Sequence, residues 1–500
     1  MSAIAATLNS RTSLDHPRFA FIRKKWPECV GAIAYTALLA FAIPFHEPWA
    51  DEAQAWQLAR SLSLPDLFRH YLRYEGSPGL WHLLLHLLVK LHVSYTGMHW
   101  ISGAIALAGV TLLIFCAPFP RAIRLTLPFT FFLAFQYAVV ARSYVLVPLL
   151  LFATAAAWRK SPLLVALLLG LLGNASLHAL AISGGMALLY IYENWRRLDR
   201  RTLLLVLAIC SAFYGFAIWT VIPRPPYLSF VVWPSKKLPI SIRLVIWSLR
   251  SCAALLTGTA QPLVLGIPLW ILFIRQFVSR RMTIYLLPIA TFAIFCGYFT
   301  NFWHSGLVVP TAITVCWIAW SSIAPRNTWT LTTIAGLLCI ALQLAWTVRA
   351  ISFDHTHAYS GDLAAARFLA PHVAAGELVA VTYYRDQKLN AFHSIGLYPY
   401  FDKPIFINQQ RPFWLWDNRQ HTDAQFEDAL SRHPQLVDAL LYEVKDRSAD
   451  AEDAARVSIE DLLRSNGYSR AHIFCGEKPE GFHQREKICH VIFMSSDTTR

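Results

Sequence analysis

The chain has 500 residues, of which 56% are hydrophobic and only 15% are charged, whereas ordinary soluble domains carry about 25% charged residues. This composition excludes a wholly water-soluble globular protein and indicates that lipid surrounds much of the chain. The formal charge of +14 does not indicate a nucleic-acid partner, because the basic residues collect in short loops between apolar runs, as the positive-inside rule expects.

The N-terminal part predicts one outward helix and an outside loop. Four basic residues, Arg18, Arg23, Lys24 and Lys25, precede the first apolar run at 28–45. Because such clusters stay in the cytoplasm, we expect residues 1–27 to be a cytoplasmic tail. The following loop, 46–77, is then outside, and its sequence HEPWADEAQAWQLARSL predicts an amphipathic helix.

A long series of apolar runs follows, which predicts a multi-pass α-helical membrane domain over 28–349. The runs lie at 79–92, 98–117, 125–141, 143–158, 162–177, 179–192, 202–222, 259–277, 283–300, 306–323 and 328–348. The run 79–92 falls short of the roughly 20 residues that a spanning helix needs. We therefore expect about eleven to thirteen transmembrane helices.

The connections between these runs set the orientation. The basic loop 193–201 is the strongest cytoplasmic anchor, and the Pro-rich segment 223–240 is predicted to be an outside loop. The apolar stretch 241–257 contains two arginines and is interpreted as lying along the membrane interface. Parity then leaves 350–500 outside.

Residues 350–500 have the composition of a small α/β domain. Helices are predicted at 360–372, 422–433 and 457–466, with Ser360 as an N-cap, and strands at 377–384, 404–408, 437–444 and 487–494. Since no G-x-G-x-x-G follows a strand, no dinucleotide site is predicted. The region is interpreted as a lid or docking domain. Cys475 and Cys489 are its only cysteines, and whether they form a disulfide is open from the sequence.

Three acidic residues are the candidates for catalysis. Asp51 and Glu52 directly follow the first helix, and because adjacent helical residues diverge by about 100°, at most one of them faces a given substrate atom. Asp51 is preferred as the catalytic carboxylate, with Glu52 in support, and Asp51 would be the ligand if a metal is present. Glu75 lies where Gly76, Pro78 and Gly79 interrupt the helix. The alternative is that these acids belong to a solvated loop.

The candidates for binding a lipid-linked phosphate are mostly basic. Arg142 lies between two apolar runs with no loop around it, where a charge is costly and a planar guanidinium suits phosphate. Its neighbour Tyr144, His304 at an outer helix end, and Lys236 and Lys237 in the Pro-rich loop complete the set. His178 is interpreted as a helix–helix hydrogen bond. Arg142 alternatively snorkels to the interface.

Several of these segments together resemble the C-type glycosyltransferase superfamily. The resemblance covers roughly 46–320 and rests on four segments: the acidic pair Asp51-Glu52, the turn Glu75-Gly76-Ser77-Pro78-Gly79, the Arg-x-Tyr-x-Leu segment at 142–146, and Asn301-Phe302-Trp303-His304. Gly79 replaces a proline common in the family, and His304 lacks an adjacent arginine, which leaves the substrate open.

The resemblance implies an integral membrane enzyme of the bacterial cytoplasmic membrane. Such an enzyme transfers a sugar from a polyprenyl-phosphate donor to a glycolipid, polysaccharide or protein on the extracytoplasmic face, by inverting displacement. A divalent metal assists some members. The alternatives are a transporter or flippase of lipid-linked sugars and a non-enzymatic membrane scaffold. If the enzyme reading is right, Asp51, Glu75 and Arg142 should share one outer cavity.

Overall fold

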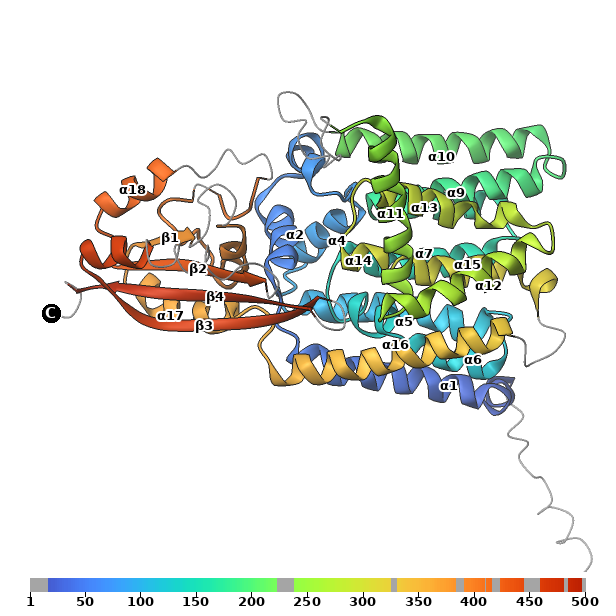
Figure 1. The fold of residues 1–500 in the computed structure, drawn as a ribbon, viewed down its shortest axis with the longest axis horizontal. Coiled ribbons are helices and arrows are strands. Elements are labelled where there is room, and N and C mark those ends of the chain that lie inside the picture. The colour runs from blue at the N-terminus through green and yellow to red at the C-terminus, as the bar shows by residue number, and fades with distance from the viewer. Residues whose placement is uncertain are drawn as a thin grey trace, which may run out of the picture.

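The structure is a computed structural model, which describes residues 17–222, 238–324, 331–383, 391–409, 411–415, 423–444, 459–480 and 484–496. It has two lobes, a helical bundle and a smaller lobe built on a β-sheet (Figure 1). Of the predicted site residues, Lys236 and Lys237 lie outside the described residues.

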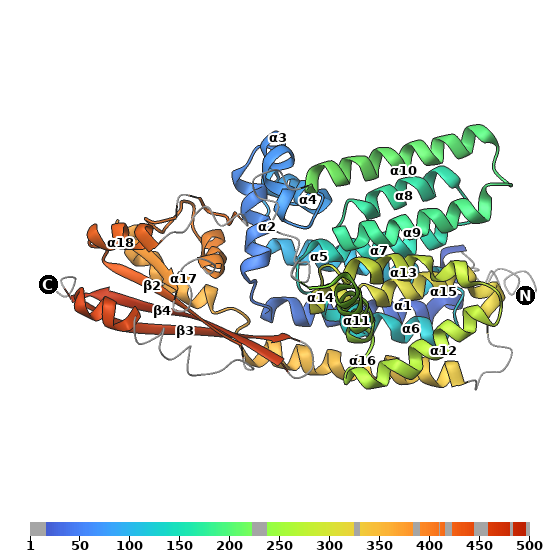
Figure 2. The same cartoon turned by 45° about the horizontal axis from the view of Figure 1, so that its top comes forward.

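Long helices lying side by side form the bundle (Figure 1). They are α1 Pro17–Ala42, α5 Gly97–Cys116, α7 Leu146–Ala157, α8 Pro162–Gly173, α9 Leu177–Asn194, α10 Arg200–Val221, α12 Gly266–Val278, α13 Leu287–Cys296, α15 Val308–Ile323 and α16 Leu331–Thr356. α11 Ile240–Thr259 runs across the others and is seen end-on in Figure 2. The interfacial placement expected for 241–257 stays a prediction, because this helix is also long and apolar enough to span a membrane.

Within the described residues, six helices are long and apolar enough to cross a membrane. They are Lys25–Phe45, Gly97–Cys116, Arg200–Val221, Ile240–Thr259, Phe302–Ile323 and Leu331–Thr356. Five shorter apolar helices accompany them. The series of long apolar helices expected from the sequence is therefore present, while membrane insertion and the number of crossings stay predictions.

The apolar run 125–141 is not one helix, which corrects the sequence interpretation. It is divided into the end of α6 Arg121–Thr126, the 3₁₀ helix Leu127–Phe129 and a π-helical turn Phe132–Gln136, followed by irregular backbone to Arg142. Irregular backbone among apolar helices is tolerated where protein groups satisfy it. Here the Tyr35 hydroxyl donates to the Leu133 carbonyl at 2.7 Å.

The outer segment after α1 forms a layer between the two lobes (Figure 1). It contains α2 Ala50–Ser61, α3 Leu64–Asp66, a π-helical turn Leu67–Tyr71, the 3₁₀ helix Leu72–Tyr74 and α4 Leu80–Lys90. The predicted helix break is confirmed between Tyr74 and Leu80. Gly79 has φ +118°, and a Cβ there would lie 2.4 Å from the Phe68 ring, so this position requires glycine.

A four-stranded sheet forms the centre of the second lobe. Its strands are β1 Val379–Tyr383, β2 Leu436–Val444, β3 Tyr468–Glu480 and β4 Gln484–Ser495, in the order β1-β2-β4-β3. β1 and β2 are parallel, and the other two pairs are antiparallel. The strands predicted at 377–384, 437–444 and 487–494 are confirmed. The one predicted at 404–408 makes only an isolated bridge, Val379 to Phe406, and β3 was not predicted.

Helices cover both faces of the sheet. Alternate residues of β2 pack on α18 Asp423–Ser431 and the helix 459–465, and the others face α17 Asp362–Ala374 and the 3₁₀ helix Ala391–Tyr400. All three predicted helices are confirmed. Cys475 of β3 and Cys489 of β4 are paired residues of the ladder and form a disulfide, so the pairing that the sequence left open is present.

Side chains of the outer segment hold the sheet lobe in place. The Glu47 carboxylate accepts hydrogen bonds from the backbone N–H groups of Ser360, Gly361 and Leu363, at the start of α17. The expected N-cap at Ser360 is therefore wrong: Gly361 is the N-cap residue, and an acid from the other lobe satisfies this terminus. Gln54 of α2 adds a second link, because it exchanges two hydrogen bonds with the Trp414 backbone.

Candidate active site

A cavity of about 520 Å³ lies where the bundle, the outer segment and the sheet lobe meet. Its lining includes five of the predicted site residues: Asp51, Glu75, Arg142, Tyr144 and His304. The convergence expected of Asp51, Glu75 and Arg142 is thus found in the structure. Their chemical roles remain a prediction.

Asp51 and Arg142 form an ion pair in this cavity. Asp51 lies in the first turn of α2, and Arg142 ends the irregular backbone before α7; Asp51 Oδ2 and Arg142 Nη1 are 2.8 Å apart. Burial raises the pKa of the Asp51 carboxyl, although the charges of Arg142 and Lys478 act in the opposite direction. The alternative in which Asp51 faces solvent and Arg142 snorkels is not what the structure shows.

Three aromatic rings surround the Arg142 guanidinium. Its carbon lies 5.7 Å from the ring centre of Trp49, 5.1 Å from Tyr144 and 5.2 Å from Trp303. Cation–π attraction stabilises a guanidinium at such distances. The rings therefore hold the charge at the cavity wall, beside the Asp51 carboxylate.

Glu75 reaches the same cavity from the helix break. The adjoining turn is fixed to the bundle, because the Gly76 carbonyl accepts from the backbone N–H of Leu177 at 3.0 Å. The Glu75 carboxylate accepts from Gln54 Nε2 at 2.7 Å. This amide is also the one that contacts Trp414, so Glu75 lies beside the junction between the lobes.

His304 orients Tyr144. The Asn301 backbone N–H donates to His304 Nδ1 at 2.9 Å, so the ring proton is on Nε2, which is 2.7 Å from the Tyr144 hydroxyl. A neutral imidazole in this arrangement does not supply the cationic contact that the sequence suggested for His304. Instead, it leaves the Tyr144 hydroxyl proton free to point into the cavity.

His178 makes a hydrogen bond between segments, as the sequence predicted, but its partner is loop backbone and not a second helix. Its Nε2 lies 2.8 Å from the Phe299 carbonyl, beyond the end of α13. Its ring also stacks on His304, with ring centres 4.0 Å apart. His178 therefore supports the residue that orients Tyr144, and it lines the cavity as well.

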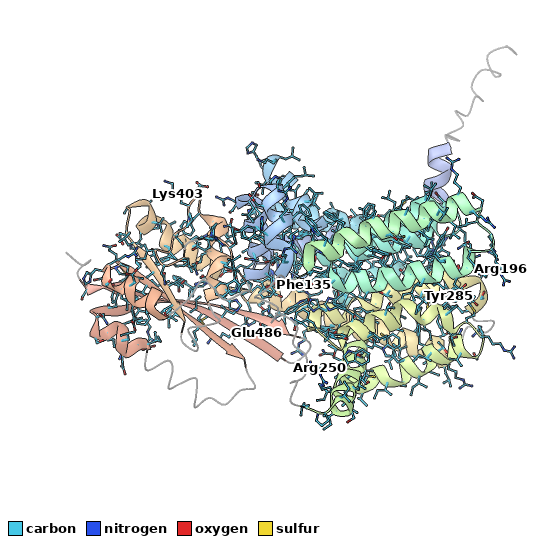
Figure 3. The ribbon with its side chains drawn as sticks, turned by 90° about the horizontal axis from the view of Figure 1, so that it is seen from above. Phe135, Arg196, Arg250, Tyr285, Lys403 and Glu486 are labelled. Atoms are coloured by element: carbon cyan, nitrogen blue, oxygen red, sulfur yellow. A yellow bond between two sulfur atoms is a disulfide. The ribbon has the colours of Figure 1, made fainter. Side chains whose placement is uncertain are left out.

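The sheet lobe contributes charged residues that the sequence did not indicate. β3 and β4 extend toward the bundle (Figure 1), and Glu486 lies between the lobes in Figure 3. Lys478 Nζ is 2.8 Å from Glu486 Oε2 and 3.6 Å from the ring centre of Trp49. Phe392 and His393 line the cavity beside this pair, and burial, aided by the charge of Lys478, lowers the pKa of His393 to about 3.

Glu52 does not line the cavity, which corrects its predicted supporting role there. Its side chain is fully buried on the other side of α2, within 2.9 Å of His99 Nε2 and 3.4 Å of His46 Nε2. It also accepts the backbone N–H of Ala141 at 2.6 Å. The divergence of adjacent helical side chains thus directs Asp51 and Glu52 to different sites.

The fit of a metal to the cavity is poor at Asp51. Its close partner is a guanidinium, and among the described residues no group of three His, Cys, Asp or Glu side chains with ligand spacing includes Asp51.

In comparisons with known proteins, no family model matches the chain and no curated protein matches its sequence.

Proposed function

We propose that this protein is an integral membrane glycosyltransferase that takes a sugar from a polyprenyl-phosphate donor on the extracytoplasmic face. The observation that carries the proposal is the Asp51–Arg142 pair, which places a carboxylate beside an aromatic-walled guanidinium in one cavity. An acid able to accept a proton and a cation able to hold a phosphate are the two groups that such a transfer needs.

The reaction is a single displacement at the anomeric carbon. The acceptor hydroxyl gives its proton to Asp51 while its oxygen forms a bond to the anomeric carbon. The bond from that carbon to the phosphate oxygen breaks, and the electron pair leaves with the polyprenyl phosphate. Since attack and departure occur on opposite faces, the configuration inverts. The raised pKa of Asp51, caused first by its burial, makes it a better base than an exposed aspartate.

Arg142 couples donor binding to the activation of Asp51. With no donor bound, its guanidinium neutralises the carboxylate at 2.8 Å. A donor phosphate competes for the same N–H groups, and a guanidinium binds phosphate with matched geometry. Donor binding then weakens the ion pair and leaves Asp51 free to accept the acceptor proton. The Tyr144 hydroxyl, oriented by His304, donates to the same phosphate.

The membrane placement has separate support. Helices α10, α11 and α12 carry exposed large apolar side chains, among them Leu204, Leu249 and Ile271, and such surfaces on a soluble protein would be a liability. Arg196 lies at the end of the bundle far from the sheet lobe (Figure 3), in the basic loop 193–201. With that end in the cytoplasm of a bacterial cell, the cavity opens where lipid-linked sugars meet glycolipid, polysaccharide or protein acceptors.

Transfer in proteoliposomes tests the proposal. Wild-type protein is given radiolabelled polyprenyl-phosphate hexose or pentose, together with envelope glycolipid, polysaccharide and protein fractions as acceptors. We expect the wild type to transfer label and Asp51→Asn to lose at least about 100-fold in rate, because an amide accepts no proton. Asp66→Asn, at an exposed aspartate of the same outer segment, is the matched control and should retain activity.

Two outcomes would contradict the proposal. Full transfer by a folded Asp51→Asn protein would remove the catalytic assignment. Movement of the labelled lipid across the bilayer by the wild type, without transfer to any acceptor, would favour the transporter instead.

A further inference from the structure

A second cluster of ionisable residues lies behind the cavity. It consists of His46, which precedes α2, Glu52 in the first turn of α2, His99 in the first turn of α5, and Asp354 near the end of α16. All four side chains are buried, and none of them lines the cavity. The proposed transfer reaction therefore makes no use of this cluster.

The spacing of three of these residues fits a metal ion. His46, His99 and Glu52 each offer one ligand atom, and these three atoms lie within 4.8 Å of one another. Glu52 Oε1 is 2.9 Å from His99 Nε2, and Glu52 Oε2 is 3.4 Å from His46 Nε2. Ligands about 2.0–2.1 Å from a tetrahedral zinc ion are roughly 3.3–3.4 Å apart, so ligand atoms up to 4.8 Å apart must move closer together when they coordinate an ion.

The groups around the cluster provide an independent observation. His46 Nδ1 lies 3.1 Å from Asp354, which leaves Nε2 turned toward Glu52. A histidine that binds a metal through one ring nitrogen commonly donates the other N–H to a carboxylate. Glu52 is held in the same manner, because its two oxygens accept the backbone N–H groups of Ala141 and Trp49. Each oxygen retains a lone pair for an ion.

We propose that His46, Glu52 and His99 bind one divalent transition-metal ion, zinc by their donor set, with Asp354 orienting His46. Two neutral imidazoles and a carboxylate suit zinc, and the charges of Glu52 and Asp354 together balance an ion of charge +2. The site is separate from any substrate-facing metal and does not depend on the proposed glycosyl transfer.

Three protein ligands leave the fourth position of a tetrahedral ion to water, and the ion holds together segments from different parts of the chain. It joins the α1–α2 connection, α2, α5 and, through Asp354, the end of α16 that leads into the sheet lobe. Glu52 also holds the Ala141 N–H, and Arg142 follows directly. The metal therefore fixes the backbone that presents Arg142 to the cavity. Without an ion, the same contacts require protons on the histidines.

Metal analysis of the full-length protein tests the site. The protein is purified in detergent without chelators, and first-row metals are measured by inductively coupled plasma mass spectrometry. We expect about one zinc ion per chain, bound tightly enough to survive purification. His99→Ala and Glu52→Gln should lose it. His82→Ala removes a buried histidine of α4 that is outside the cluster, and Asp51→Asn changes the neighbouring cavity acid; both should keep the metal.

A second measurement covers the case in which the cluster variants do not fold. Wild-type protein is stripped with a chelator and loaded with Co²⁺, which should give the strong visible absorption of a tetrahedral site in a one-to-one titration. The proposal is overturned if wild-type protein contains no stoichiometric metal and shows no such titration. It is also overturned if Asp51→Asn loses the metal while His99→Ala retains it, since the ion would then belong to the cavity.

Discussion

At the scale of single residues, the cavity contains two ion pairs. Asp51 faces Arg142 and Glu486 faces Lys478, each at 2.8 Å, whereas the third acid of the lining, Glu75, accepts from the Gln54 amide. Removing one partner of a buried pair leaves the other charge uncompensated, which costs about 3–5 kcal/mol. A phosphate that enters must exchange partners within this set, and the donor is therefore bound by replacing existing ion pairs.

A buried histidine between two carboxylates in the sheet lobe gives a prediction for pH. His490 of β4 lies 2.8 Å from both Asp438 of β2 and Asp362 of α17. Burial opposes its charge, but the two carboxylates outweigh burial and raise the pKa of His490 to about 10. Since the folded pKa lies above the unfolded value of about 6.5, the stabilisation is complete below pH 6.5 and is lost as the pH rises toward 10.

We therefore expect the thermal unfolding midpoint of the wild type to fall between pH 6.5 and 10 more steeply than that of His490→Gln. This variant should also be less stable at neutral pH, by about 3–5 kcal/mol. His472→Gln, at an exposed histidine of β3, should behave as the wild type. A wild-type midpoint that rises over this pH window, relative to the variant, would contradict the assignment.

At the scale of elements, the hairpin of β3 and β4 brings the sheet lobe into the candidate site. Its sequence did not predict a strand at 468–480, because polar residues such as Glu477 and Lys478 interrupt the alternation of apolar side chains. Those polar residues are at the end of the hairpin that meets the bundle (Figure 1). The sequence interpreted this lobe as a lid or docking domain without chemistry of its own. The structure adds that the lobe contributes the cation Lys478 to the cavity lining.

Substitution of Lys478 tests whether the hairpin contributes to donor binding. Lys478→Gln should raise the apparent KM for the polyprenyl-phosphate donor roughly tenfold or more, because a charge-assisted hydrogen bond contributes about 1.5–3 kcal/mol. The double variant Lys478→Gln with Glu486→Gln separates this effect from that of an uncompensated Glu486. Lys403→Gln, at a lysine far from the cavity (Figure 3), is the control. An unchanged KM in the double variant would show that the hairpin covers the cavity without contributing to donor binding.

Apolar runs predicted most helices, because the length of a run reflects the helix that it forms. The prediction of one helix over 125–141 failed because uniform burial conceals the periodicity of this run: Phe131, Phe132 and Phe135 all pack in the core. Its irregular backbone depends on hydrogen bonds with distant residues, such as the one that the Ala141 N–H donates to Glu52. A single sequence contains no signal for such contacts.

At the scale of the whole molecule, the sequence brought Asp51, Glu75 and Arg142 to one cavity and preferred Asp51 over Glu52, but it could not show that Glu52 faces a different site. Both acids have the same local pattern, and only the packing of α2 between the lobes decides which faces the cavity. The contribution of Lys478 was equally hidden, since it depends on the docking of the sheet lobe. That docking is held by Glu47 at α17 and by Gln54 at Trp414.

The orientation of the two lobes in the membrane is the last prediction. The helical bundle has exposed basic residues at the end away from the sheet lobe, including Arg159, Arg197 and Arg280. Basic loops remain in the cytoplasm, and the Cys475–Cys489 disulfide suits an oxidising compartment. Both observations favour an extracytoplasmic cavity, which is the orientation that we predict. A fusion of alkaline phosphatase after Arg500 should therefore be active, and green fluorescent protein at the same position should be dark.

As the matched control, each reporter is fused to a chain that is truncated in the loop 193–201. There the alkaline phosphatase should be inactive and the green fluorescent protein should fluoresce. Alkaline phosphatase needs its own disulfides and is inactive in the cytoplasm, so the two reporters answer independently. An active phosphatase at 193–201 together with fluorescence after Arg500 would place Asp51 and Arg142 on the cytoplasmic side. Because a donor exposed on the outer face cannot reach them there, that result would remove the proposed reaction and leave the membrane architecture intact.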